Sequence, residues 1–468
     1  MLLRIAFAAV ALLASVAQSE AQVSQSKPAP GSPDVIQITL HPIATTRPVL
    51  RYALLPEETQ MTPGEATFVY WLAGSLGSPT DKLEELTGRD YADIPLHDLP
   101  ASKVPEQLAM FPNRLRFTDL AARRQEVHWD TTFQQDGVSA LLPYLSDLRR
   151  DAKLLGWRAR LELAHGDWNA ANYTLQSGLS MCLQMNRRAV LVQGLVACGV
   201  SSIMLDRVQE WIAQPGAPNL YWSLSNLPQP FFDLRPMQQN ERALIYYTFP
   251  ELNQADPLAI TPEQWRQVAA SFEKLNESQP KNPHGIEGQI ARAFVAASLA
   301  PQARQHLVAM GIGLEKVDAM SVDQAVGVYD LIRYRQLSDE CYKAWMLPYW
   351  EGRQALERAM KEIQQERETS QNPLLLLPPA VTRARVNFAR VDRQICALRV
   401  IEALRDYAAR HDDQPPAALD QIVDLPVPID PISGKPFAYE SHGQTAIVSA
   451  PGTTTGAPAV RYELTFTK

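Results

Sequence analysis

The alternation of apolar and polar positions predicts a chain of helices that fold back on one another. The pattern is clearest over residues 141–185, where leucines and alanines recur every three or four positions and so share one helix face. Gly166 suits the left-handed residue that ends a first helix. Asp167 suits the N-cap of a second helix, which runs from Trp168 to about Met185. This segment therefore predicts a helical hairpin.

Similar patterns predict further helices, several of them marked by a proline or a capping side chain. Thr62-Pro63 is expected to open a helix that extends to about Gly74, and Ser321 with Gln324 forms a capping box. The other expected helices span residues 81–87, 114–128, 187–211, 237–249, 261–277, 285–300, 302–310, 321–346, 348–369 and 380–411. About a dozen helices predict a mainly α fold, an irregular helical-hairpin array that is α-solenoid-like.

The pattern changes after His411, where Pro415 and Pro416 stop the last long helix. Residues 445–450 and 460–466 alternate as strands do, and Phe437 with Tyr439 shares one face of another strand. A short strand is also expected at residues 36–40. We therefore expect a small antiparallel β element at the C-terminal end of the helical array.

The first residues have the pattern of a secretion signal. Arg4 precedes an apolar run over residues 5–14, and small-x-small cleavage points end at Ala17 and Ala21. The run is too short to span a bilayer. We expect an exported protein, located in the periplasm, in the cell envelope or outside the cell.

The 468 residues then divide into four parts. Residues 1–21 form the signal peptide, 22–47 a linker with a short strand, 48–370 the helical-hairpin domain, and 371–468 a long helix with a small β-sheet. The uncharged stretch 189–205 raises the alternative of a membrane span. It is 17 residues long and contains Gln193 and two serines, so a helix buried among others is favoured. No stable span is expected after signal removal.

Charge and cysteine content narrow the function classes. The net charge is −7 and no basic run exceeds two arginines, so no nucleic-acid partner is expected. Cys182, Cys198, Cys341 and Cys396 lie in apolar helical patterns without a CxxC pair. We expect them to be buried as small hydrophobic side chains, while a bond between the last two stays open.

Motifs of catalysis and metal binding are missing from the sequence. It has no GxSxG elbow, phosphate loop, dinucleotide fingerprint or HExxH, and its eight histidines are scattered. No cofactor and no metal are therefore predicted. His128-Trp129-Asp130 offers a base beside an acid, with a surface loop as the alternative.

Aromatic residues beside prolines form the candidate binding surface. Such residues can line a groove for an extended peptide or a sugar, or they can pack in the core around a kinked helix. We expect the groove to receive a peptide or another envelope protein. The candidate residues are Tyr221, Trp222, Phe231, Phe232, Tyr246 and Tyr247, with Phe249 beside them.

Three resemblances add to these patterns. Residues 166–171, Gly-Asp-Trp-Asn-Ala-Ala, resemble the turn of one tetratricopeptide repeat, with its large aromatic displaced to Trp157. Residues 405–409, 414–420, 430–439 and 448–452 resemble the globular end of type II secretion pseudopilins. Threonines at 453–455 replace the acidic calcium loop of that family, and no prepilin cleavage site precedes a membrane helix.

The whole chain resembles a group of exported helical proteins abundant in planctomycetes. The resemblance rests on residues 48–56, 62–64, 216–222, 347–350 and 430–431, and Glu65 stands where that group has asparagine. It implies an exported helical protein and carries no activity.

These observations predict an exported helical scaffold or interaction protein with no identifiable catalytic motif. The alternatives are an envelope hydrolase or glycan-active enzyme with a carboxylate pair, and an accessory of a secretion or pilus-like apparatus.

Overall fold

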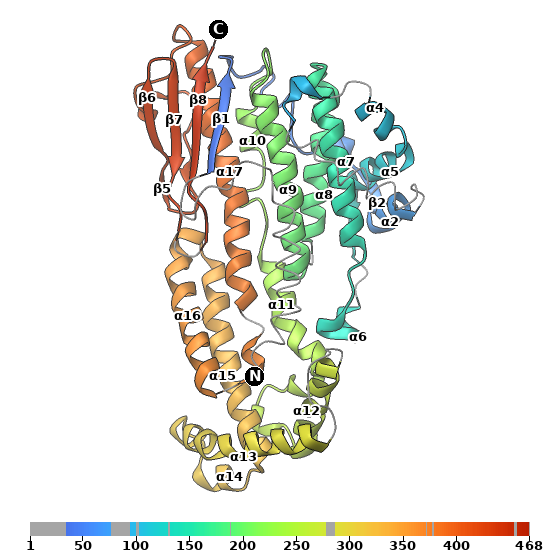
Figure 1. The fold of residues 1–468 in the computed structure, drawn as a ribbon, viewed down its shortest axis with the longest axis vertical. Coiled ribbons are helices and arrows are strands. Elements are labelled where there is room, and N and C mark those ends of the chain that lie inside the picture. Colours follow the sequence, from blue (N-terminus) through green and yellow to red (C-terminus); the bar gives the residue numbers. More distant parts are fainter. Residues whose placement is uncertain are drawn as a thin grey trace.

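The protein is an elongated, mainly helical molecule with a small sheet at one end (Figure 1). The computed structural model describes residues 34–75, 94–99, 103–129, 132–187, 189–277, 286–370, 372–376, 379–453 and 456–467. Fifteen α-helices lie in these ranges. The expected signal peptide and the expected helix at 81–87 lie outside them.

Three long helices form the centre of the upper half of Figure 1: α7 (Tyr144–Ala164), α8 (Trp168–Asn186) and α9 (Leu191–Ile212). Each contacts the other two. The predicted hairpin between α7 and α8 is confirmed. Gly166 has a φ of +69°, and the Asp167 carboxylate accepts the Ala170 N–H at 3.0 Å. Gly178 of α8 faces Met204 of α9, where a larger side chain would collide. The two helices therefore pack closely.

A smaller layer covers α7 and α8 on their outer side. It consists of α2 (Thr67–Ser75), α4 (Lys103–Leu108), α5 (Pro112–Ala122) and the parallel pair β2 (Thr62–Glu65) and β3 (Arg124–Glu126). The prediction that Thr62-Pro63 opens a helix is wrong. Gly64 has a φ of +113°, so the backbone cannot be helical there.

Glu65 starts the helix instead, because its carboxylate accepts the Thr67 and Phe68 N–H groups at 2.9 and 3.2 Å. The helix expected over 114–128 also ends early. It stops at Ala122 because the chain turns into β3, whose residues pair with β2.

The lower half of the molecule contains α11 (Arg235–Thr248), α12 (Pro262–Glu277), α13 (Ile286–Ala309), α14 (Leu314–Asp318), α15 (Val322–Lys343) and α16 (Tyr349–Ser370). The predicted cap at Ser321 is confirmed, since its side chain accepts the Gln324 N–H. Residues 285–300 and 302–310 were expected as two helices. They form one, α13, with Pro301 inside it.

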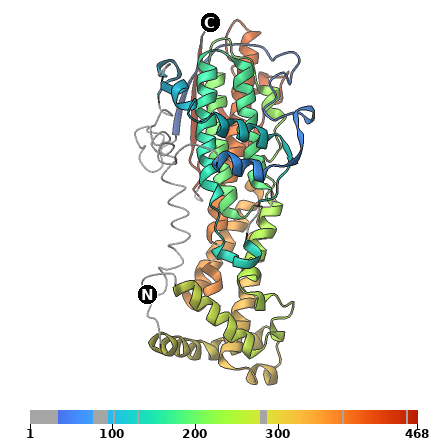
Figure 2. The ribbon, with the colours of Figure 1, turned by 90° about the vertical axis from the view of Figure 1, so that its right-hand side faces the viewer.

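The longest helix, α17 (Pro379–Ala409), runs upward from α15 and α16 to lie beside α9 (Figures 1 and 2). The C-terminal sheet packs at its upper end. Its strands are β1 (Asp34–Leu40), β6 (Ala438–His442), β7 (Thr445–Ala450) and β8 (Val460–Phe466), in the order β1-β8-β7-β6. A two-residue pair, β4 (Ile429–Asp430) and β5 (Lys435–Pro436), precedes it.

The expected antiparallel sheet is a mixed sheet. Strands β6, β7 and β8 are antiparallel as predicted, but β1 pairs with β8 in parallel along its whole length. The predicted strand at 36–40 thus belongs to the C-terminal sheet. It joins that sheet because Ile38 and Leu40 are buried against the same core as β8.

Two hydrophobic cores follow one another along the molecule. The upper core joins α5, α7, α8, α9, α17 and the sheet, and the lower core joins the end of α11 to α12 through α16. Among the described helices, α9 alone has the length and apolar composition of a membrane span, and 67% of that window is buried within the molecule. In this structure α9 is a core helix.

Candidate functional site

The aromatic residues singled out in the sequence separate into two groups. Tyr221 of α10 (Tyr221–Ser225), Phe231 and Phe232 are buried in the upper core, each less than 3% exposed. The rings of Phe231 and Phe232 meet edge to face, and Phe232 meets Phe388 of α17 in the same way. Phe249 is buried in the lower core.

Only Trp222, Tyr246 and Tyr247 of the candidate aromatics keep part of their surface accessible. Tyr246 packs against the lower core, and the Arg335 guanidinium lies 5.7 Å from its ring centre. Trp222 packs against the upper core beside Tyr221. The structure does not bring the six residues together around one opening.

Polar and charged side chains gather instead between α5, α7 and α8. They form the polar cluster, which consists of Asp119, Arg158, Glu162, Thr174 and Ser177. Arg158 donates to both Asp119 oxygens at 2.9 and 2.7 Å, and its Nε lies 3.8 Å from Glu162. Thr174 donates to Glu162 at 2.7 Å, and Ser177 donates to Asp119 at 2.6 Å. The cluster joins three helices through charged hydrogen bonds.

Arg123 and Gln176 extend the cluster toward the N-terminal segment. Arg123 donates to Ser177 at 2.8 Å and to Gln176 at 3.2 Å, while its guanidinium lies 3.7 Å from the ring centre of Tyr173. Gln176 donates to the Ala53 carbonyl at 2.9 Å. The polar cluster therefore also holds the chain that precedes α2.

Glu162 is the carboxyl group of the cluster whose pKa is raised. Burial raises its pKa to about 7, although the Thr174 hydroxyl and the Arg158 guanidinium lower it. A nearly neutral pKa beside a second carboxylate is a pattern found in general acid–base pairs. Here, however, Arg158 lies between the two carboxylates, and the Thr174 hydroxyl donates to one Glu162 oxygen. This arrangement is that of an ion-pair network.

A second such network lies at the α5–α7 contact. Arg114 donates to both Asp147 and Asp151, and burial raises the pKa of Asp151 to about 6. No group of three or more His, Cys, Asp or Glu side chains in the described ranges is placed to hold a metal ion. His128 is exposed next to the buried Trp129, whose indole donates to Gln184, and Asp130 lies outside the described residues.

The four cysteine side chains form no disulfide bond. Cys182, Cys198 and Cys341 are buried and Cys396 is partly buried, and all four are free. Burial raises the pKa of Cys396 and of Cys341 to about 12, so these thiols are not ionised at neutral pH.

The surface feature that sequence analysis did not single out is the α2 aromatic face, formed by Phe68 and Trp71. These side chains are 65% and 50% exposed, and they lie one turn apart on a helix without a charged residue. The opposite side of α2 holds Thr67, Tyr70 and Ala73, which are buried. The sequence contained a signal for this face, because the helix is apolar all round. Such a short helix is normally buried on every side, so its exposure is unusual.

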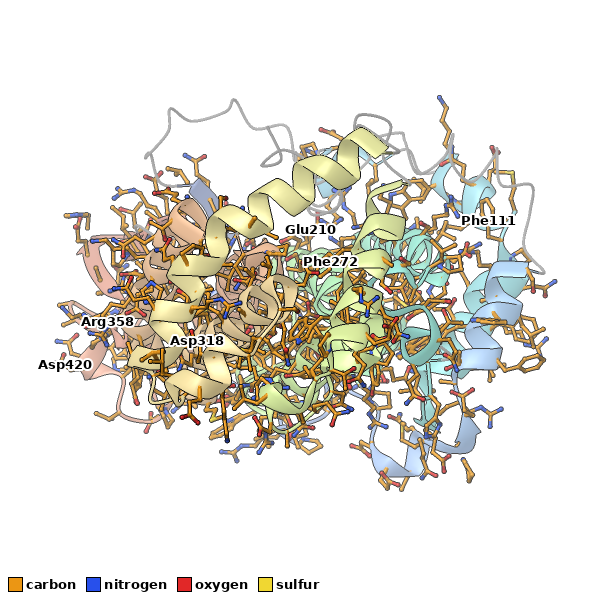
Figure 3. All side chains as sticks on the ribbon, turned by 90° about the horizontal axis from the view of Figure 1, so that it is seen from below. Phe111, Glu210, Phe272, Asp318, Arg358 and Asp420 are labelled. Carbon is orange, nitrogen blue, oxygen red and sulfur yellow. The ribbon has the colours of Figure 1, made fainter. Side chains whose placement is uncertain are left out.

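Helix α2 and the C-terminal sheet lie on opposite sides of the molecule (Figure 1). Figure 3 looks along the long axis and shows the same separation. Phe111, which precedes α5, lies at one edge, Asp420 of the C-terminal segment lies at the other, and Glu210 of α9 lies between them. A partner bound at α2 would leave the sheet uncovered.

Comparison with protein-family models, with curated proteins and with solved structures finds no match to this chain. Its function has to be inferred from its own residues.

Proposed function

We propose that the protein is an exported helical scaffold that binds an apolar segment of another envelope protein through the α2 aromatic face. One observation carries the proposal: two large aromatic side chains are exposed on an uncharged helix whose other face is already buried. Exposed apolar side chains that gather on one element are typical of protein interaction sites. Burying two such rings would contribute about 2 kcal/mol each.

The wider sequence features support an exported scaffold. The first 21 residues have the pattern of a secretion signal. The consecutive contacts of α7, α8 and α9, and of α13, α15, α16 and α17, support an irregular helical-hairpin array. The resemblances to a tetratricopeptide turn and to exported planctomycete proteins agree with an exported helical scaffold.

The hydrolase alternative receives less support from the same residues. A glycan-active carboxylate pair needs a free acid and a free base on either side of a bond. Asp119 and Glu162 are 11% and 19% exposed at the side chain, and Arg158 contacts both. Their geometry favours a role in holding helices together.

Photocrosslinking tests the proposal directly. A crosslinking amino acid placed at Trp71 in the exporting cell should give an adduct with one envelope protein, and the same residue at Val423 should not. Val423 is the matched control because it is 85% exposed and lies three residues after Asp420, which Figure 3 shows at the edge opposite Phe111.

The purified partner then gives the quantitative test. Its affinity for the double variant Phe68→Ser, Trp71→Ser should fall about tenfold or more, because aromatic anchors dominate such interfaces. Leu141→Ser, which changes an 83% exposed side chain, should leave the affinity unchanged. Equal adducts at positions 71 and 423, or unchanged affinity of the double variant, would refute the proposal.

A further inference from the structure

Among the described residues, one buried arginine, Arg385, has neither a carboxylate within 4 Å nor a full set of hydrogen-bond acceptors. Seven arginine side chains are at least nine-tenths buried in the described parts of the chain. Five of them contact a carboxylate within 4 Å, and Arg123 donates to four oxygen atoms. Arg385 of α17 contacts no carboxylate within that distance and has one hydrogen-bond acceptor. The five paired arginines are Arg114, Arg160, Arg207, Arg393 and Arg405.

The Arg385 guanidinium lies at the beginning of α16. Its Nη2 donates to the Leu347 carbonyl at 2.9 Å, and its Cζ lies 5.8 Å from the ring centre of Tyr349, the first residue of that helix. The side chain is 7% exposed, and its Nε has no partner. A buried N–H without an acceptor has lost its hydrogen bonds to water without replacement, and the cost is greater in a charged group.

The structure gives this guanidinium little compensating negative charge. A helix N-terminus carries a partial positive charge from its unpaired N–H groups, and α16 is 22 residues long. Desolvation by burial lowers the pKa of the Arg385 guanidinium, and nearby Asp392 only partly offsets this effect. Both observations indicate a missing anion.

Asp392 does not supply that anion. It lies seven residues further along α17, about 10 Å along the helix axis, and its carboxylate accepts the Phe231 N–H at 2.8 Å. Burial raises the pKa of Asp392 to about 6, while the Phe231 N–H and the Arg385 guanidinium lower it.

A second unpaired donor belongs to the turn that leads into α16. Trp345 is 5% exposed, and its indole Nε1 has no hydrogen-bond partner. Its ring packs on Phe388, with the ring centres 6.4 Å apart, and Phe388 lies one turn after Arg385 on α17. Met346 and Leu347, which connect Trp345 to α16, are 66% and 43% exposed, so this turn meets solvent.

We propose that Arg385 and Trp345 form a binding site for an oxyanion at the N-terminus of α16. The ligand group is a carboxylate or a phosphate, because both present oxygen atoms that accept from a guanidinium and from an indole N–H. The site is separate from the α2 aromatic face and does not depend on its function.

Calorimetry and thermal unfolding of the full chain test the site. Acetate and phosphate are titrated at constant ionic strength, with chloride as the reference anion. One of the two should bind with saturation and raise the unfolding temperature. Stabilisation by phosphate alone would assign a phosphate ligand, and stabilisation by acetate would assign a carboxylate ligand.

Three variants locate the binding. Arg385→Met should abolish the anion effect, and Trp345→Phe should weaken binding roughly tenfold because it removes one donor to a charged group. The control Arg235→Met changes an exposed arginine that is paired with Asp233 and should bind as wild type does. Without anion, Arg385→Met should unfold at the wild-type temperature or above, since it removes an unpaired buried charge.

Two results would overturn the proposal. One is the absence of saturable stabilisation of the wild-type chain by either anion. The other is undiminished binding by Arg385→Met or, should that variant not fold, by Trp345→Phe.

Discussion

At the scale of single residues, the molecule is distinguished by charges held inside helical contacts. Arg158 of α7 with Asp119 of α5, and Arg114 of α5 with Asp151 of α7, cross from one helix to another. Breaking a buried pair by removing one partner leaves an uncompensated charge, which costs more than the pair itself contributes. These residues therefore fix which helix faces meet.

Glu162 makes stability depend on pH in a defined direction. Its pKa is raised from 4.5 to about 7 in the folded chain, so the folded state binds this proton more tightly than the unfolded state. The resulting stabilisation is complete below about pH 4.5 and is lost as the pH rises through 7.

Replacing Glu162 by glutamine should remove this dependence. The amide stays neutral and its carbonyl can still accept from Thr174. We expect Glu162→Gln to raise the free energy of unfolding at pH 8 by roughly 2–3 kcal/mol and to change it little at pH 5. Denaturant unfolding at the two pH values measures the difference. Glu315→Gln, at an exposed position, is the control, and an equal effect of both variants would contradict the prediction.

At the scale of elements, local sequence signals predicted the helices whose ends are capped by neighbouring residues. Asp167 and Ser321 cap the helices that begin beside them. The start of α2 was missed because its cap also depends on a distant strand. Glu65 accepts the N–H of His128, 63 residues away, as well as those at the start of α2. The two helices expected over 285–300 and 302–310 are one, since α13 continues through Pro301 although proline removes an intrahelical hydrogen bond.

The cap at Asp167 gives a quantitative prediction for the α7–α8 hairpin. Asp167→Ala removes the acceptor of the Ala170 N–H and should destabilise the chain by about 1 kcal/mol. Asp167→Asn keeps an acceptor and should cost much less. Thermal unfolding of the two variants distinguishes them, and equal losses would show that the carboxylate charge, rather than the cap, matters.

The candidate site was harder to predict than the helices. Sequence spacing grouped Tyr221 with Phe231 and Phe232 as a possible groove, but it does not show which side of a kinked segment faces the core. All three are buried there. Whether Arg385 has a counter-ion depends on where α16 begins relative to α17. A local sequence pattern does not predict how two such helices are placed in space.

At the scale of the whole molecule, the first described strand, β1, pairs with the last one, β8, in the same sheet. Gln37 and Glu463 are 426 residues apart and hydrogen-bond across the β1–β8 pair at 3.3 Å. The sequence predicted both strands but not their pairing, because periodicity reports which face of a strand is apolar and not which strand lies beside it.

Truncation tests the contribution of β1. A chain that begins at Asp34 should unfold as the mature protein does, whereas a chain that begins at His41 lacks Ile38 and Leu40, which are 4% and 0% exposed. Burying two such side chains contributes about 4 kcal/mol. We expect the shorter chain to unfold at a clearly lower temperature. Equal unfolding temperatures would show that the sheet is stable without its parallel strand.

The pairing of β1 with β8 also determines when the sheet can form during synthesis. Strand β1 is made long before its partner β8, so the sheet cannot be completed until β8 has been made. Contacts between such distant segments form late and slowly, because the intervening chain must first lose its freedom. Until then the apolar side of α17 that the sheet covers stays open. A chain that crosses a membrane from its N-terminus would need protection at that surface during its final step.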